Sequence, residues 1–369
     1  MNKPIAKPDK MGSYRQEDVI FLLRDISNYQ IEINSDEKER LIQSGTHYSE
    51  MLPVEYQPTE EYLNLFHNTL EQYSKRVAIA VGVVAEQIME RNGLENLVLV
   101  SLARAGTPIG ILIKRYLAFK YQVDIPHYSI SIIRGRGFDE TAIDYIYDQH
   151  EQARIQFVDG WTGKGAITFE LEKSCKAYND SRGVILDPTL SVLADPGHCV
   201  SIYGTRDDFL IPSACLNSTV SGLVSRTVLN HDIMDENDFH GAKYYKELAD
   251  ADVSNLYVDT LATEFEHVQN EIMAELGRLR KEDTTPSWKG MKSVELIQER
   301  FGIQNRNFIK PGVGETTRVL LRRVPWKILV NPEQSNDLTH ILMLAKERNV
   351  PIEEYKDMSY SCCGIIKEL

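Results

Sequence analysis

The sequence is short of cysteine and has no long hydrophobic run. Its 369 residues include five cysteines without a CxxC pair, and its nine histidines show neither HxxxH nor HExxH spacing. A disulfide framework, a zinc ribbon and any other metal site built by the protein are therefore not predicted. The longest uncharged apolar stretch, Val77–Ala85, is far shorter than the ~20 residues of a membrane helix, and the polar start has no signal-peptide core. We expect a cytoplasmic protein without membrane contact.

Negative charge is in excess, but it is distributed unevenly. The formal net charge is −13. From Thr285 onward 13 Lys and Arg face 10 Asp and Glu, a balance of +3, whereas the first 284 residues have 28 against 44, a balance of −16. Phosphate contacts need clustered Lys and Arg, so an even distribution would argue against nucleic-acid binding. The last part of the chain is instead predicted to be a separate unit with a different electrostatic task.

Short apolar runs alternate with amphipathic stretches through most of the chain. A helix is predicted from Thr59 to Arg91, because Thr59 can cap it and Gly93 stands where a helix stops. Further helices are predicted at 107–119 and after residue 165, and a helical stripe runs from Leu261 to Leu279. The predicted strands are Leu97–Ser101, Tyr128–Ile133, Arg154–Val158, Val184–Leu186 and Cys199–Tyr203. This alternation predicts an α/β fold with a doubly wound parallel sheet.

A second α/β unit is predicted at the C-terminus. The polar segment 281–290 contains Pro286 and is typical of a linker. A helix from Ser293, a strand at Lys327–Val330, a helix at 338–348 and a strand at 352–355 follow it. We therefore predict a first domain at 1–280 with an N-terminal helical extension, a linker at 281–290, and a second domain at 291–369.

Two glycine-containing turns follow predicted strands, at the edge where α/β proteins bind ligands. The first, Ser101–Gly106, presents backbone N–H groups at a helix start, and Arg104 adds a guanidinium for an anion. The second, Val158–Gly165, can curl round a phosphate, while its Asp159 can accept from sugar hydroxyls or hold a hydrated Mg²⁺. A Walker loop is excluded because glycine replaces its Ser or Thr. Two such turns in one sheet favour a phosphorylated ligand.

The loop after the strand Tyr128–Ile133 contains two arginines. Arg134 and Arg136 flank Gly135, which suits a mobile cationic lid over pyrophosphate, although a plain solvated loop fits as well.

A polar cluster stands in the otherwise apolar run 204–229. Ser218, Ser221 and Ser225 step by three and four, so on a helix they would share one face. They would bind a ligand there, or form cap and backbone bonds. Trp161, in the second turn, would stack on a base or sugar, or merely cover its loop. The candidate base- or substrate-binding residues are Trp161, Arg206, Asp207, Asn217, Ser218 and Ser221.

The two turns resemble those of type I phosphoribosyltransferases, whose first loop receives pyrophosphate and whose second grips phosphoribosyl pyrophosphate (PRPP). The resemblance implies PRPP or a related ribose phosphate as ligand, Mg²⁺ bound with the substrate, and Asp159 and Arg134 as catalytic residues. The pattern departs from the family in two respects: Gly160 stands where a second acid is usual, and the turn to Thr162 and Gly163 is about two or three residues shorter. The implied phosphate-binding residues are Ala103, Arg104, Ala105, Gly106, Arg136, Gly160, Thr162, Gly163, Lys164 and Gly165.

Longer runs resemble one bacterial family in particular. VSLARAGTP, RGRGFDETA, FVDGWTGKGAI and the segment 204–229 are similar to the PRTase-like domain of tellurite-resistance and stress gene clusters, a family also catalogued as StiP under the name cysteine protease. The resemblance spans roughly residues 18–279 and implies a transferase that makes or processes a nucleoside-like metabolite from PRPP. Two alternatives stay open: an RNA-binding regulator that senses a nucleotide without turnover, and a cysteine protease.

The protease alternative needs a thiol activated by a histidine. Cys199 follows His198, and Cys215 would need His231 or His240 from further along the chain. Adjacent residues on a strand point to opposite faces, and neither cysteine lies in a known protease signature. Buried, unreactive thiols are therefore predicted.

The C-terminal unit contains the run KPGVGETTRVLLRR, Lys310 to Arg323, followed by the predicted strand KILV. It resembles the PELOTA domains related to kink-turn-binding ribosomal proteins, whose glycine turn and helix start grip a kinked RNA backbone. Gly314 stands where kink-turn binders commonly have Asn, so contact with the RNA backbone is expected rather than base-specific recognition. The implied RNA-binding residues are Lys310, Gly312, Gly314, Glu315, Thr316, Arg318 and Arg322.

Overall fold

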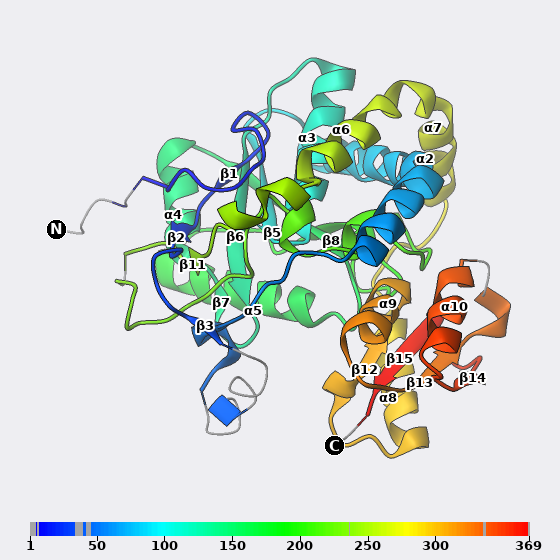
Figure 1. The fold of residues 1–369 in the computed structure, drawn as a ribbon. Coiled ribbons are helices and arrows are strands. Elements are labelled where there is room, and N and C mark those ends of the chain that lie inside the picture. Colours follow the sequence, from blue (N-terminus) through cyan, green and yellow to red (C-terminus); the bar gives the residue numbers. More distant parts are fainter. Residues whose placement is uncertain are drawn as a thin grey trace.

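The computed structural model describes residues 5, 7–33, 40–41, 46–235, 237–334 and 337–367, without the side chain of Arg322. It shows a first α/β unit (residues 5–279), a connecting segment (280–288) and a C-terminal α/β unit (289–367). Figure 1 shows the C-terminal unit, coloured orange to red, packed below the helix α2 of the first unit. The structure is therefore a mixed α/β protein with one main sheet in each unit and two further two-stranded sheets in the first.

The first unit is built on a parallel sheet with the strand order β1-β6-β5-β8-β9-β10. The short β7 (Gly137–Phe138) pairs antiparallel with β6. Outside this sheet, β2 (Arg24–Asp25) pairs with β11 (Gly241–Ala242), and β3 (Glu32–Ile33) pairs with β4 (Leu52–Pro53). The strands of the main sheet are β1 (Ile20–Phe21), β5 (Leu97–Ala103), β6 (His127–Ile133), β8 (Arg154–Trp161), β9 (Leu190–Ala194) and β10 (Ile202–Thr205).

Helices cover both faces of this sheet, as Figure 1 shows. The long α2 (Glu60–Asn92) packs on β9 and β10 and is itself covered by α3 (Gly106–Tyr121), α6 (Ser254–Thr263) and α7 (Gln269–Leu279). The opposite side carries α4 (Glu140–Gln149) and α5 (Ala166–Arg182). This sandwiching of α2 explains the uncharged run Val77–Ala85, because a helix buried on most sides has no polar face.

The C-terminal unit has a four-stranded sheet in the order β12-β15-β13-β14. On one face, Val294 and Ile297 of α8 pack against Leu329, Cys363 and Ile365. The other face carries α9 and α10. The elements are α8 (Lys289–Phe301), β12 (Ile309–Pro311), α9 (Val313–Arg322), β13 (Pro325–Val330), α10 (Thr339–Glu347), β14 (Ile352–Glu354) and β15 (Cys362–Ile366).

Several predicted elements differ from the structure. The predicted strand Val184–Leu186 is a loop, in which Ile185 is 95% exposed, and the strand of this region is β9, five fully buried residues. The strand predicted at Cys199–Tyr203 begins three residues later. The stripe from Leu261 to Leu279 is broken by a 3-10 turn. The short 3-10 helices are Tyr48–Glu50, Pro212–Ala214, Ser218–Val220, Lys246–Ala251, Phe265–His267, Arg306–Phe308 and Pro332–Gln334.

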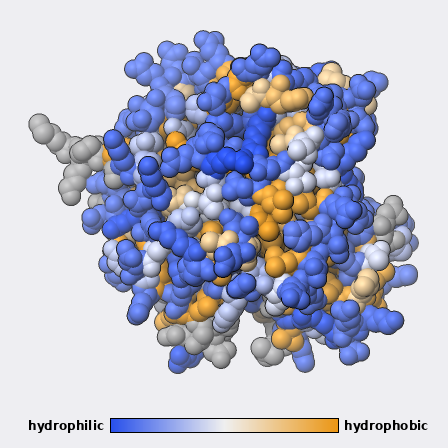
Figure 2. Space-filling model, turned by 45° about the horizontal axis from the view of Figure 1, so that its top comes forward, coloured by the Kyte–Doolittle hydropathy of each residue, from blue (hydrophilic) through white to orange (hydrophobic). Residues whose placement is uncertain are grey.

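The surface is mainly polar. Figure 2 shows a face that is mostly hydrophilic, with hydrophobic patches among the hydrophilic residues. Among the described residues, no helix combines the length and the apolar character needed to span a bilayer.

The contact between α2 and β10 depends on Gly204. A Cβ built there would lie 2.4 Å from the carbonyl oxygen of Ala80, whereas one at Gly277 of α7 meets nothing within 4 Å. We expect Gly204→Ala to lower the free energy of unfolding by about 2 kcal/mol, because α2 must move off the sheet. Gly277→Ala should raise it by about 1 kcal/mol through helix propensity. Urea unfolding of both variants tests this; equal stabilities would contradict the close packing.

Candidate functional site

The two glycine turns meet at the carboxyl edge of the main sheet. A Cβ on Gly106 would lie 2.4 Å from the carbonyl oxygen of Val158, and one on Gly160 would lie 3.1 Å from that of Ala105. Only glycine permits this approach. Arg104, however, directs its guanidinium to the carbonyl oxygen of Val224, at 3.4 Å.

A cavity of about 240 Å³ lies beside the second turn. It unites residues from three places in the sequence: the second turn, the loop after β6, and the C-terminal unit. Its polar lining includes Arg134, Asp159, Trp161, Thr162, Lys164, Lys310 and Glu315. The structure thus brings the predicted second turn and Arg134 together with two residues that the sequence assigned to RNA binding. Within the described residues, no group of three or more His, Cys, Asp or Glu side chains is placed to hold a metal ion.

Burial and like charge shape the ionisation of this cavity. Burial lowers the pKa of Lys164 to about 8, and the cations of Lys310 and Arg134 add to the effect. Its ammonium donates to the carbonyl oxygens of Arg306 (2.7 Å) and Ile309 (3.2 Å). Burial also raises the pKa of Asp159 to about 7. A buried acid that is half neutral at pH 7 is poised to exchange a proton or to accept an anion nearby.

Other predicted site residues lie outside the cavity and have protein partners. Arg136 forms an ion pair with Glu50. Arg206 lies 3.5 Å from Asp195 and stacks over Tyr203, while Asp207 pairs with Arg76 of α2 at 2.9 Å. The loop between Arg134 and Gly137 is fastened by hydrogen bonds from the amides of 134, 135 and 137 to Tyr48 and Glu170.

The predicted serine face is wrong, because the run 217–225 forms only a short 3-10 turn. Ser218 donates from its amide and its hydroxyl to the carboxylate of Glu55. The hydroxyl of Ser221 donates to the carbonyl oxygen of Asn217 at 2.7 Å. The hydroxyls bind backbone and carboxylate groups, so the cap-and-backbone alternative describes their contacts. A ligand role for them stays a prediction.

One thiol lies at this edge of the sheet. Cys199 is in the loop after β9, not on a strand, because His198 before it takes a left-handed φ of 52°. The prediction that His198 and Cys199 point to opposite faces of a strand is therefore wrong. The sulfur lies 3.7 Å from the carbonyl oxygen of Gly163, and the amide of Cys199 donates to Asp195 at 2.7 Å. The same carboxylate oxygen accepts from Thr162 at 2.5 Å.

The surroundings of Cys199 and His198 disfavour both the thiolate and the imidazolium. Burial raises the pKa of Cys199 to about 12, and the side chain is 1% exposed. Burial, with the cations of Arg206 and Lys289, lowers the pKa of His198 to about 4. The sulfur is therefore a neutral thiol and the ring a neutral imidazole at pH 7.

The other four cysteines are also buried. Cys175 lies on α5, and Cys362 and Cys363 lie on β15. Cys215 has the hydroxyl of Thr69 at 3.6 Å, whereas His240 contacts Ser131 and Asp139. The predicted burial of the thiols is confirmed, and the sequence reasoning missed Asp195, which precedes Cys199 by four residues.

The C-terminal unit docks on this edge, and the contacts include Arg318, which the sequence assigned to RNA binding. Val313 at the start of α9 donates its amide to Asp208 of the first unit at 2.8 Å. Arg318 donates to the carbonyl oxygen of Ala214 at 3.1 Å and lies over the ring of Trp161. Tyr360 donates to the carbonyl oxygen of Gly163 at 3.0 Å. The side chain of Arg322 lies outside the described residues.

The fold is that of a mixed α/β protein with a parallel central sheet and a C-terminal α/β domain. The family model described as "Tellurite-like stress resistance cysteine protease StiP" matches residues 12–262. A model described as "PELOTA RNA binding domain" matches residues 288–368. "Cysteine protease StiP" of Acinetobacter baylyi is 35% identical over 381 residues, covering 99% of this chain and 96% of that protein. The chain belongs to the StiP family.

These matches overturn the predicted enzyme class. The relative and the family are both named cysteine protease, so the prediction of a PRPP-dependent phosphoribosyltransferase is wrong. Glycine turns at a sheet edge define a place for a ligand, not its chemistry. The PELOTA part of the prediction is confirmed, whereas PRPP as a partner has no support. Substrate-bound Mg²⁺, the domain boundary within 281–290 and the individual site residues stay predictions.

The raised pKa of Asp159 has a consequence for stability. Its pKa is about 7 in the folded chain and near 3.8 in the unfolded chain, so the folded state holds the proton more tightly, and stability is lost as pH rises from 4 to 7. We expect Asp159→Asn to be more stable than the wild type by roughly 2 kcal/mol at pH 8.5, with little difference at pH 4. Urea unfolding at both pH values measures this.

The exposed carboxylate of Asp180 on α5 supplies a control for the loss of one charge. A gain by Asp180→Asn as large as that by Asp159→Asn at pH 8.5 would contradict the burial of Asp159.

Proposed function

We propose that this chain is a cysteine protease whose nucleophile is Cys199, seen with its site covered. The observation that carries the proposal is the position of this thiol. It lies in the loop beyond the carboxyl end of β9, with its amide fixed on Asp195 and its sulfur 3.7 Å from the carbonyl oxygen of Gly163, a residue that lines the 240 Å³ cavity. The carboxyl edge of a parallel sheet is where α/β proteins place their reacting groups.

The neighbouring groups suit thiol chemistry. In the covered site a ring with a pKa of about 4 cannot deprotonate a thiol with a pKa of about 12. Once the site is uncovered and both pKa values return toward their ordinary range, we expect His198 to take the proton of the thiol, and the thiolate then attacks the peptide carbonyl carbon. The imidazolium returns the proton to the leaving amine, and water hydrolyses the thioester to a free acid and the thiol. The lowered pKa of His198 keeps the ring unprotonated at neutral pH, and Asp195 holds the loop that carries both residues.

The site needs uncovering before it can act. A thiol whose pKa burial raises to about 12 is almost entirely protonated at pH 7. The connecting segment and the C-terminal unit supply the cover: the amide of Trp288 donates to the carbonyl oxygen of His198 at 2.9 Å, and that of Gly290 donates to Gly197 at 3.0 Å. Moving them would admit both water and a polypeptide.

A second function, RNA binding by the C-terminal unit, is favoured by the PELOTA match. We propose that the helix start of α9 binds the RNA backbone through amides and through Lys310, Gly312, Gly314, Glu315, Thr316 and Arg318. The amide of Val313 already binds an anion there, the carboxylate of Asp208. The likeness of the first unit to the type I phosphoribosyltransferase fold stays a prediction about fold alone.

The nucleophile is tested by substitution. We expect Cys199→Ser to lower the hydrolysis of fluorescently labelled casein by roughly 10³-fold or more, because the hydroxyl is a far weaker nucleophile at this position. Cys175→Ser, a change of the same atoms at a buried thiol on α5, should retain the rate. Thermal melts show that both variants fold. Full activity of Cys199→Ser would disprove this assignment.

A further inference from the structure

An acid of the first unit occupies the α9 start, defined here as residues 310–318. The carboxylate of Asp208 accepts from the amides of Val313 (2.8 Å) and Ser361 (2.9 Å), one oxygen to each. The hydroxyl of Ser361 donates to the backbone carbonyl oxygen of Asp208 at 3.2 Å. A Cβ on Gly312 would lie 3.2 Å from the same carboxylate. Asp208 therefore sits where a helix start and its glycine turn hold an anionic oxygen.

The rest of the α9 start is covered by the same docking. Gly314 faces Ala214, whose side chain would be 3.3 Å from a Cβ at that position. The guanidinium of Arg318 is bound to the carbonyl oxygen of Ala214. Lys310 lines the cavity between the units. An RNA backbone cannot reach these groups while the units are docked.

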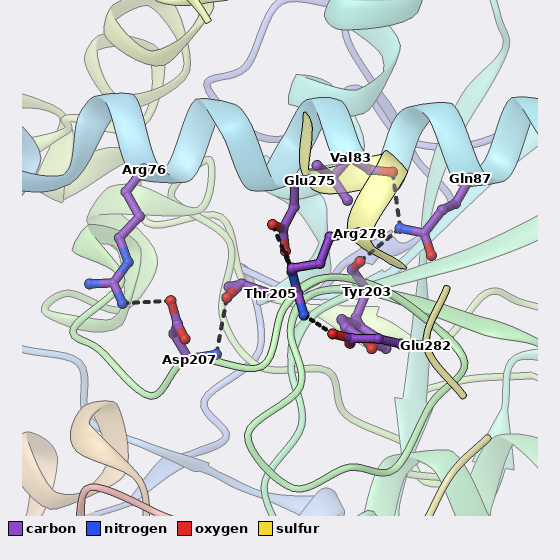
Figure 3. Close-up of polar contacts among 9 residues, drawn as sticks. All are labelled: Arg76, Val83, Gln87, Tyr203, Thr205, Asp207, Glu275, Arg278 and Glu282. Carbon is purple, nitrogen blue, oxygen red and sulfur yellow. Dashed lines mark hydrogen bonds and ion pairs between the residues drawn. The ribbon is translucent and has the colours of Figure 1, made fainter. Parts of the chain in front are cut away.

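The position of Asp208 is set from the first unit. Figure 3 shows Gln87 of α2 bound to the carbonyl oxygens of Val83 and Tyr203, and Arg76 bound to Asp207. The amide of Asp207 donates to the hydroxyl of Thr205 at 3.0 Å. These bonds fix the end of β10 at Thr205 and the following Asp207 beneath α2, and Asp208 comes directly after Asp207. The hydrogen bonds around Asp207 therefore fix the position of the Asp208 carboxylate at the α9 start.

Among the described residues, the carboxylate of Asp208 is bound only by backbone amides, so another anion can replace it there. Burial raises the pKa of Asp208 to about 6, which shows that its surroundings disfavour the charge more than the amides favour it. A phosphate brings a permanent charge to the same amides, and an RNA brings several phosphates.

We propose that Asp208 is an intramolecular stand-in for an RNA phosphate, so that RNA binding and docking of the C-terminal unit exclude each other. This inference rests on the proposed RNA-binding function. Trp288 and Gly290 donate to the carbonyl oxygens of His198 and Gly197, and Tyr360 donates to that of Gly163, which the sulfur of Cys199 also contacts. Release of the unit by RNA therefore also uncovers the thiol. The docked form is then the resting state of the protease.

The experiment uses the full chain and a fluorescently labelled kink-turn RNA hairpin, with binding followed by anisotropy. We expect Asp208→Ala to lower the Kd about tenfold, because the internal competitor is gone. Asp187→Ala removes an acid paired with Arg91, far from the α9 start, and should leave the Kd unchanged. Asp208→Asn, which keeps the shape without the charge, serves if the alanine variant fails to fold.

The second readout is the rate at which iodoacetamide alkylates Cys199, measured by peptide mass spectrometry. Saturating RNA should raise this rate in the wild type, and Asp208→Ala should raise it without RNA. Equal Kd values for the wild type and the Asp208 variants would overturn the competition while leaving RNA binding intact. If no variant binds RNA, the RNA-binding function fails, and the competition fails with it. Tighter binding without faster alkylation would overturn the link to the thiol.

Discussion

The structure depends on one constraint: the carboxyl edge of the main sheet is closed by a second folded unit. The hydrophobic core of the first unit continues without a break into Val313, Leu320 and Ile341 of the C-terminal unit. On the sheet side the contact is made by backbone groups, such as the carbonyl oxygens of Gly163 and Gly197. Ligand sites of α/β proteins lie at this edge. A ligand of this edge must therefore enter through the interface between the first unit and the C-terminal unit.

Electrostatics explain why the joint forms where it does. The first 284 residues have a balance of −16 and the remainder +3, so the two parts attract over distance. At contact the attraction becomes specific: Asp208 meets the positive end of α9, and Asp337 of the C-terminal unit meets Arg76. Lys164 and Lys310 are left together in the cavity with Glu315, and burial lowers the pKa of both amines. The burial of these two amines is unfavourable, and it weakens an interface that is otherwise tightly packed.

The sequence predicts those helices and strands whose ends and apolar runs are set by neighbouring residues. The helix from Thr59 was placed within one residue, because its acidic first turn and Gly93 are local signals. The strands at 97, 128 and 154 were found for the same reason, as short apolar runs next to turns. β9 was missed because a run of five residues after an apolar loop has no distinctive period, and Ile185, exposed in that loop, carries the stronger apolar signal.

The candidate site was harder to predict, because its parts belong to both units. Sequence patterns act within one unit at a time, so they predict RNA binding for Lys310 and Arg318 and no role for Asp208. The docked structure puts these residues against the second turn and Trp161. The enzyme class was wrong for a related reason: the glycine turns specify how closely two loops approach, which many chemistries share.

The same closure reconciles a protease family with an unreactive thiol. The pKa of Cys199 is high because burial removes water, and Asp195 adds a smaller repulsion of the thiolate. Cys199 belongs to the hydrophobic core of the first unit, and the segment at Trp288 and Gly290 binds the carbonyl oxygens of His198 and Gly197 beside it. When the cover moves, solvation returns and the pKa falls toward that of an ordinary thiol. In the proposed mechanism the reactivity of Cys199 therefore depends on the interface between the two units, because the contacts that hold this interface closed also keep the thiol buried.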